Sequence, residues 1–250
     1  MRPPALAAIG TAAYAVFLLA TLPASFVLAS AQKAEPGKFE VREATGTIWR
    51  GAAKLTLNTP GGPVAVDRFE WRWLPARLAA ARLALDITAT APGLEAHYVG
   101  ARAIGGWEAR DLEARGDAAK LATVLPWIAA WRPEGTITVT SPRLDTDGAE
   151  VRGTARIEWR GAAVAVSDVR PLGTYRADIE AQGHAGKVTI TTVSGPLRIT
   201  GTGTLTPPTR VAFSGEARAD AESARALEPL LNLLGPARPD GARALEWRAP

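Results

Sequence analysis

The sequence predicts a mostly β protein, with an N-terminal transmembrane helix followed by an antiparallel, duplicated β-sheet domain that carries two short helices. Three observations support this fold class. Residues 3–32 contain no charged side chain, beyond residue 38 the apolar period changes to two, and the motif Trp-Arg-Gly-Ala-Ala occurs at residues 49–53 and again at residues 159–163. The first predicts a membrane segment, the second predicts strands, and the third indicates an internal repeat.

The apolar run over residues 6–28 is long enough to cross a bilayer, since about twenty helical residues suffice. A cleavable signal peptide is the alternative, because residues 29–31 (Ala-Ser-Ala) fit a cleavage site. Signal-peptide cores usually span about 7–15 residues, so the longer run favours an uncleaved anchor. Arg2, with no acidic residue near it, predicts that the N-terminus stays cytoplasmic and that the bulk of the chain is exported. Residues 1–31 are therefore expected to form a cytoplasmic stub and anchor, with Pro23 kinking or ending the helix.

A polar connector over residues 32–38 precedes the strands. Apolar and polar residues then alternate strictly, as in strands with one buried and one wet face. Turn residues rich in Gly, Pro and Asp recur about every ten residues, which is typical of antiparallel meanders. The clearest alternating stretches are residues 69–73, 83–88, 137–139, 175–180, 188–191 and 197–200.

Residues 117–130 and 221–234 predict two short helices, and residues 75–83 are ambiguous between a helical turn and a strand. Asp117 is the expected N-cap of the first, with Pro126 as an interruption, whereas Asp220 or Ser223 caps the second and Gly235 ends it. Two short helices cannot cover about a dozen strands. The sheet must close into a barrel, fold into a sandwich, or leave a curved apolar groove open.

A second pair of markers supports a duplication. Residues 132–135 (Arg-Pro-Glu-Gly) and 238–241 (Arg-Pro-Asp-Gly) each follow a Leu-rich segment. We expect two copies of a unit of roughly a hundred residues, residues 32–135 and 136–250, within one continuous periplasmic β domain.

Composition excludes several classes of protein. The chain has no cysteine, which removes disulfides and thiolate metal sites. The net charge is +4, but its arginines and lysines are dispersed among 25 acidic residues. A nucleic-acid groove needs clustered cations, so no nucleic-acid partner is expected.

No motif predicts an enzyme, and we assign no catalytic, cofactor-binding or metal residues and no cofactor. His97 and His184 lie near turns without ligand spacing, which favours polar strand-end residues. Residues 145–148 begin like a calcium loop but lack its later acidic ligand, so a hairpin turn is the better interpretation. Residues 201–203 (Gly-Thr-Gly) lack the third glycine of a dinucleotide fingerprint. A hydrolase would require acids, or a Ser/His pair, to converge in a pocket.

The tryptophans have two interpretations. Trp49, Trp71, Trp73 and Trp159 fit core or barrel-lining positions, or else the wall of a groove for an apolar guest or another protein. Residues 127 and 131, both Trp, lie on or after a Leu-rich helix and could pack on the sheet or meet a partner.

Several motifs in order resemble the type II secretion system protein N family, also called general secretion pathway protein N. They are residues 21–24 (Thr-Leu-Pro-Ala), 46–53 (Gly-Thr-Ile-Trp-Arg-Gly-Ala-Ala), 69–73 (Phe-Glu-Trp-Arg-Trp), 171–176 (Pro-Leu-Gly-Thr-Tyr-Arg) and 230–235 (Leu-Leu-Asn-Leu-Leu-Gly). The likeness runs essentially end to end, although residues 247–250 leave little length for a final strand.

The resemblance implies a single-pass protein of the cell inner membrane with a periplasmic domain. Its function would be that of a non-enzymatic accessory component of the type II machinery that exports folded proteins across the outer membrane, with other components of that machinery as partners. A more distant likeness to AsmA-like proteins implies the alternative, a periplasmic lipid-binding or lipid-transfer module.

Overall fold

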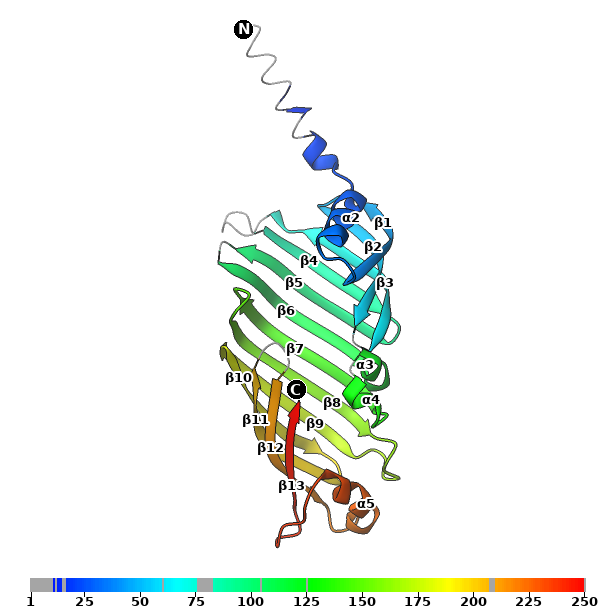
Figure 1. Ribbon diagram of the computed structural model, residues 1–250, viewed down its shortest axis with the longest axis vertical. Helices are drawn as coiled ribbons and strands as arrows, with labels where there is room; N and C mark the ends of the chain where they lie inside the picture. Colours follow the sequence, from blue (N-terminus) through cyan, green and yellow to red (C-terminus); the bar gives the residue numbers. More distant parts are fainter. Residues whose placement is uncertain are drawn as a thin grey trace.

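The computed structural model describes residues 11, 13, 14, 17–59, 61–75, 83–103, 105–124, 126–206 and 210–249. Its centre is one sheet of 13 strands whose spatial order is the order in the sequence (Figure 1). Every neighbouring pair is antiparallel. β1 and β13 form the two edges of an open sheet. Of the three predicted arrangements, the structure therefore adopts the open, curved one.

The strands are long, and most neighbouring strands are joined by turns of a few residues, whereas the connections over residues 74–82, 118–133, 164–172 and 220–242 are longer. Gly93 and Gly148 turn two of the hairpins at φ values of 73° and 98°, a backbone region that glycine adopts without strain. The strands are β1 (Phe39–Gly46), β2 (Arg50–Thr59), β3 (Gly62–Trp73), β4 (Leu83–Ala91), β5 (Leu94–Ala103), β6 (Gly106–Asp117), β7 (Glu134–Thr146), β8 (Val151–Ala163), β9 (Gly173–Gly183), β10 (Ala185–Ser194), β11 (Leu197–Thr206), β12 (Arg210–Ala219) and β13 (Arg243–Ala249). The C-terminal residues thus do form a final strand, paired with β12.

Both predicted helices are present. The first is split into α3 (Ala118–Val124) and α4 (Pro126–Ala129), so Pro126 does interrupt it. Asp117 is its N-cap, because Asp117 Oδ1 accepts a hydrogen bond from Ala119 N at 2.9 Å. The second is α5 (Ala224–Leu234), which follows Ser223 without a side-chain cap bond and ends at Gly235. The ambiguous stretch over residues 75–83 lies mostly outside the described residues.

The predicted membrane segment differs from expectation at its outer end. Residues 17–21 are helical, and the helix ends at Pro23, as predicted. Pro23 forms a β-bridge with Thr47, and Ile48 N donates to Leu22 O at 3.1 Å. A separate helix, α2 (Ala24–Ala34), then packs against β1. Hydrophobicity alone did not reveal that this part of the run contacts protein.

Among the described residues, no helix is long and apolar enough to cross a membrane. Residues 1–10, 12, 15 and 16 of the predicted anchor lie outside the described ranges.

The helices occur at a regular interval. α2 precedes β1, α3 and α4 precede β7, and α5 precedes β13, so six strands separate successive helical segments. All of them lie along the same long side of the sheet (Figure 1). The two Trp-Arg-Gly-Ala-Ala motifs, by contrast, lie at the start of β2 and at the end of β8. The helix spacing is therefore the better sign of a duplication, which stays a prediction.

Two buried clusters lie at opposite ends of the sheet. One joins Ala24 and Leu28 of α2 to Leu55, Val66 and Trp71. The other joins Leu227, Leu230 and Leu231 of α5 to strand residues that include Tyr175 and Leu197. Each end of the sheet is thus covered by a helix.

Candidate functional site: an apolar trough

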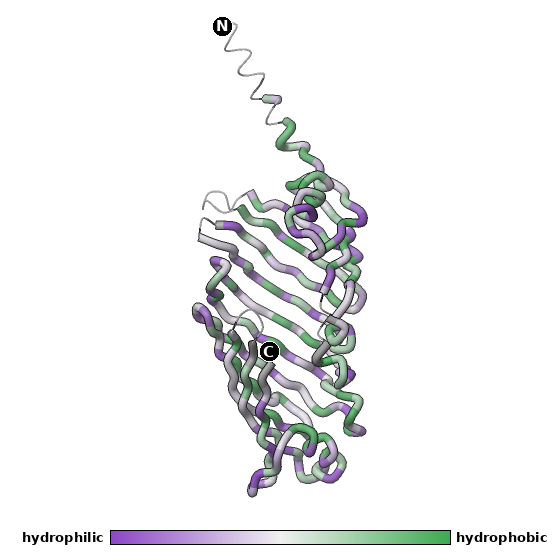
Figure 2. The backbone as a smooth tube through the Cα atoms, viewed as in Figure 1, coloured by the Kyte–Doolittle hydropathy of each residue, from purple (hydrophilic) through white to green (hydrophobic). Residues whose placement is uncertain are grey.

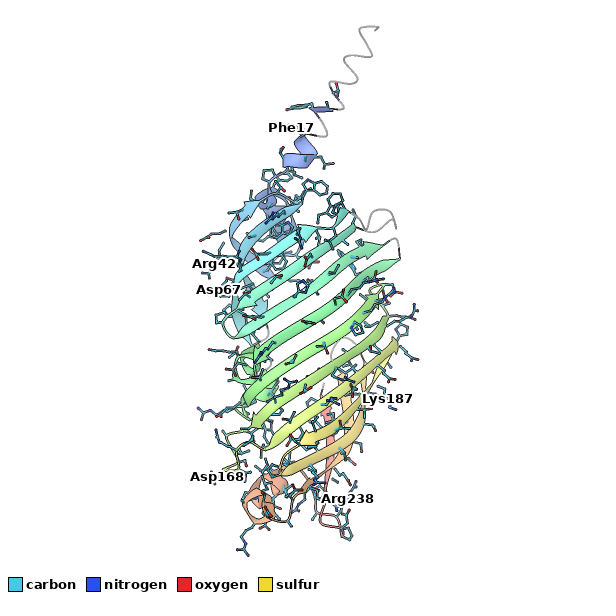
Figure 3. The ribbon with its side chains drawn as sticks, turned by 180° about the vertical axis from the view of Figure 1, so that it is seen from behind. Phe17, Arg42, Asp67, Asp168, Lys187 and Arg238 are labelled. Carbon is cyan, nitrogen blue, oxygen red and sulfur yellow. The ribbon has the colours of Figure 1, made fainter. Side chains whose placement is uncertain are left out.

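Alternation along the strands gives the sheet two different faces, and hydrophobic and hydrophilic residues alternate visibly along the chain (Figure 2). The inner face, on the side of α2 and α5, carries Trp71, Ile87 and Tyr98, which are register partners on β3, β4 and β5. The outer face carries the intervening polar residues. Figure 3 shows this face, with Arg42 and Asp67 near the margin formed by the first strands.

Ion pairs cross between neighbouring strands on the outer face. Arg156 Nε lies 2.7 Å from Asp178 Oδ1, and Arg72 Nη2 lies 2.7 Å from Asp86 Oδ2. The hydrogen bond from Arg72 lowers the pKa of Asp86, helped by His97 and opposed by burial. Exposed pairs of this kind stabilise weakly, but they keep this face hydrated and charge-balanced.

Between the two helix-covered ends, the inner face forms two adjoining hollows. The larger, about 680 Å³, extends from Trp49 and Trp73 across β4–β6 to Leu144 and Val151. The smaller, about 320 Å³, lies further along the same strands and is lined by Leu57, Val66, Ala89, Leu94, Leu121 and Ile137. Ile87 and Tyr98 line the first, while Ala89 and Ala96, two positions along on the same face, line the second. We call the continuous surface the apolar trough.

The trough is open. Leu83 and Trp107 in the larger hollow are each 57% exposed, and Leu57 in the smaller is 38% exposed. Soluble proteins rarely leave large contiguous apolar surface uncovered unless it meets a partner or ligand. Burial raises the pKa of Tyr98 inside the larger hollow, as expected for a phenol in low-polarity surroundings.

A tryptophan wall closes the trough on the side of the N-terminus. The rings of Trp49 and Trp73 lie 4.6 Å apart, and Trp49 Nε1 donates to Leu19 O at 2.9 Å. Trp71 lies two residues before Trp73 on β3, and its Nε1 donates to Ile48 O at 3.1 Å. A Cβ at Gly51 would lie 2.4 Å from the Trp71 ring, so only glycine fits beneath it. The Gly-Thr-Ile-Trp-Arg-Gly motif therefore builds this wall.

The other tryptophans behave differently. Trp159 packs against the C-terminal cluster, 6.1 Å from the Tyr175 ring, and Trp159 Nε1 donates to Glu134 O at 2.9 Å. Trp131 is packed against the same cluster. Both predicted roles are thus present: Trp71 and Trp159 pack in or against the core, whereas Trp49 and Trp73 line a groove.

The residues considered for chemistry do not converge. His97 lies on the outer face, with Nε2 2.8 Å from Asp86 Oδ1, while His184 lies at the β9–β10 turn, with Nδ1 3.3 Å from Ala149 O. Asp147 Oδ1 accepts hydrogen bonds from the backbone N–H groups of Glu150 and Ala149, which lowers the pKa of Asp147 and confirms a hairpin turn. Within the described ranges, no three His, Cys, Asp or Glu side chains are placed to hold a metal ion.

The Gly-Thr-Gly stretch has a packing role. A Cβ at Gly201 would lie 2.5 Å from the Phe213 ring, and a Cβ at Gly203 would lie 2.5 Å from Ala212 O. These glycines let β12 and the Phe213 ring approach β11 closely, so they serve the sheet and not a nucleotide.

Sequence reasoning did not single out several residues of the trough, among them Tyr98, Trp107 and Arg102. Arg102 lies at its rim, with the guanidinium carbon 4.7 Å from the centre of the Trp107 ring. Arg102 continues the inward-facing series Leu94, Ala96, Tyr98 and Gly100 on β5, so counting alternate positions would have placed it on the apolar face.

Residues 38–246 match the family described as "Type II secretion system (T2SS), protein N". A protein named "Type II secretion system protein N" from Pectobacterium carotovorum subsp. carotovorum is 24% identical over 251 residues, covering 94% of this chain and 92% of the relative. No solved structure matches. Because the family match spans most of the chain, including β1–β12 in full, the protein belongs to the type II secretion system protein N family, a non-enzymatic component of type II secretion.

Proposed function

We propose that this protein is an accessory inner-membrane component of the type II secretion system, anchored by its N-terminal segment with the sheet in the periplasm. The match to the family over residues 38–246 carries this proposal. The exposed apolar side chains of Tyr14, Phe17, Leu18 and Leu19 support an anchor, because a run of exposed apolar residues needs an apolar environment.

The free edge of the sheet is the surface that we assign to another secretion component. The edge of β1 is protected, since α2 packs against it and Val41 N donates to Gln32 Oε1 at 3.3 Å. One edge of β13 pairs with β12. The opposite edge carries a backbone hydrogen bond near the start of the strand, where Ala244 N donates to Pro236 O. By alternation, the backbone of Glu246 also points outward, and among the described residues no further strand pairs there. An unprotected edge accepts an extended partner segment as an added strand.

A gene deletion tests the secretion role. Loss of secretion of a folded substrate, with an intact outer membrane, is the expected result, and complementation with the wild-type gene restores secretion.

Glu246→Pro tests the edge, because proline removes the outward N–H without touching the ladder to β12. Glu246→Ala is the matched control. We expect the proline variant to fold but fail to complement, whereas the alanine variant complements. Full secretion by the proline variant would refute the role of the edge.

One observation favours the alternative function. A filled inner face would suit a scaffold, whereas an open aliphatic trough suits a lipid-handling module, and the inner face is open between its two covered ends.

A further inference from the structure

We propose that the trough binds a single membrane phospholipid with an anionic headgroup, whose phosphate lies at Arg102 and whose acyl chains lie across β4–β7. The inference deepens the lipid-handling alternative and does not depend on the role of the β13 edge. It assigns a site, an orientation and a headgroup charge.

The floor and length of the trough suit hydrocarbon chains. Small residues on neighbouring strands keep the floor low, among them Ala89, Ala96, Gly100 and Ala109. From Arg102 to Leu94, β5 spans about 26 Å at about 3.3 Å per residue. One leaflet contributes about 15 Å to a hydrocarbon core about 30 Å thick, so an acyl chain fits within this length.

The charge at the rim gives the lipid its orientation. Two carboxylates border the larger hollow, Glu108 and Asp145, and both lie against Arg143, at 3.1 and 2.7 Å. Arg102 forms no ion pair with a carboxylate of the described residues, and its guanidinium lies over the exposed Trp107 ring. Arginine binds phosphate oxygens bidentately, and an indole suits the boundary between water and hydrocarbon. The headgroup therefore lies at this rim, with the chains running toward Leu121 and Ile137.

Position relative to the N-terminus argues for a lipid as the occupant. Trp49 lines the larger hollow and also bonds Leu19 O, next to the exposed Phe17 and Leu18. The hollow thus begins where the apolar N-terminal segment meets the sheet. A lipid leaving the bilayer along this segment reaches the hollow with little exposure of its chains to water, which lowers the cost of transfer.

The test uses the full-length protein with vesicles of phosphatidylcholine that contain a photoactivatable phosphatidylglycerol. Ala96→Trp fills the floor of the trough, and Thr88→Trp places the same ring on the exposed outer face as the matched control. We expect labelled peptides from β4–β7 in the wild type and the control, and a roughly tenfold loss in Ala96→Trp. Ala109→Trp, on the neighbouring strand β6, should act likewise, and circular dichroism verifies that each variant is folded.

Headgroup charge is tested with Arg102→Glu and with Arg102→Lys. The glutamate variant should lose labelling by photoactivatable phosphatidylglycerol while keeping labelling by the phosphatidylcholine analogue of the same chain length. The lysine variant should retain most of both, because it keeps the charge. Displacement of the label by inorganic phosphate alone would instead indicate an anion site without chain binding, and would overturn the proposal.

Equal labelling of Ala96→Trp and Thr88→Trp, or labelling confined to peptides outside β4–β7, would also overturn it, as would cross-linking of a protein helix in the trough in cells. The secretion assay separates this failure from failure of the proposed function. A variant that loses lipid labelling but supports secretion leaves the secretion role intact, whereas Glu246→Pro should lose secretion and keep the labelling.

Discussion

Replacing Ala24 with leucine tests whether the chain after Pro23 belongs to the folded domain. Ala24 is 1% exposed and lies in the cluster that contains Leu55, Val66 and Trp71. Three additional carbon atoms at such a position overpack the cluster, and overpacking typically costs about 1–3 kcal/mol. If the residue faced lipid instead, leucine would be favourable by about 0.3–0.6 kcal/mol.

Ala29→Leu on the same helix is the control, because Ala29 is exposed. Urea unfolding of the full-length protein, followed by tryptophan fluorescence, reports on this cluster because Trp71 belongs to it. We expect a lower midpoint for Ala24→Leu and an unchanged one for Ala29→Leu. Unchanged midpoints for both variants would refute the docking of α2.

Three further predictions use the same unfolding assay. Trp71→Phe should lower the free energy of unfolding by about 1 kcal/mol, because it removes the hydrogen bonds of Trp71 Nε1. Trp73→Phe should be neutral or stabilising, because Trp73 Nε1 is buried without a partner among the described residues. Equal losses in the two variants would contradict this reasoning. Leu227→Ala, at a fully buried position of α5, should lower the free energy of unfolding by about 2–5 kcal/mol. Leu233→Ala, at a position that is 62% exposed, should change it by no more than about 0.5 kcal/mol. A small effect of both substitutions would mean that α5 does not cover the sheet. Asp86→Asn should be less stable than the wild type at neutral pH, because the arginine hydrogen bond lowers the pKa of the folded-state carboxyl. That stabilisation is fully present at pH values above the ordinary aspartate pKa of 3.8, and it is lost as the pH falls through the lower pKa of Asp86 in the folded protein. The unfolding free energies of the wild type and Asp86→Asn should therefore converge in acid.

Alternation along the chain predicted β3, β4, β7, β9, β10 and β11 and their faces, because a side-chain period of two follows directly from strand geometry. Asp117, Pro126 and Gly235 likewise act where the sequence placed them, since caps and breaks depend on neighbouring residues alone. Alternation did not distinguish an open sheet from a barrel or sandwich, because all three share it and differ in how distant strands meet.

The end of the apolar N-terminal run was harder to predict, because Ala24 and Leu28 are as hydrophobic beside a sheet as in lipid. The trough itself needed the register. Leu94 and Ile137 are far apart in sequence and line one hollow only because β5, β6 and β7 are neighbours.

The strictly sequential order of the 13 strands has a consequence for how such a protein can vary. No strand depends on a partner distant in the chain, so inserting or deleting one hairpin disturbs two neighbours and leaves the remaining ladder unchanged. Each hairpin adds two strand spacings, or roughly 10 Å, to the long dimension of the molecule. The length of the sheet in a relative can therefore differ from that of this protein in steps of one hairpin.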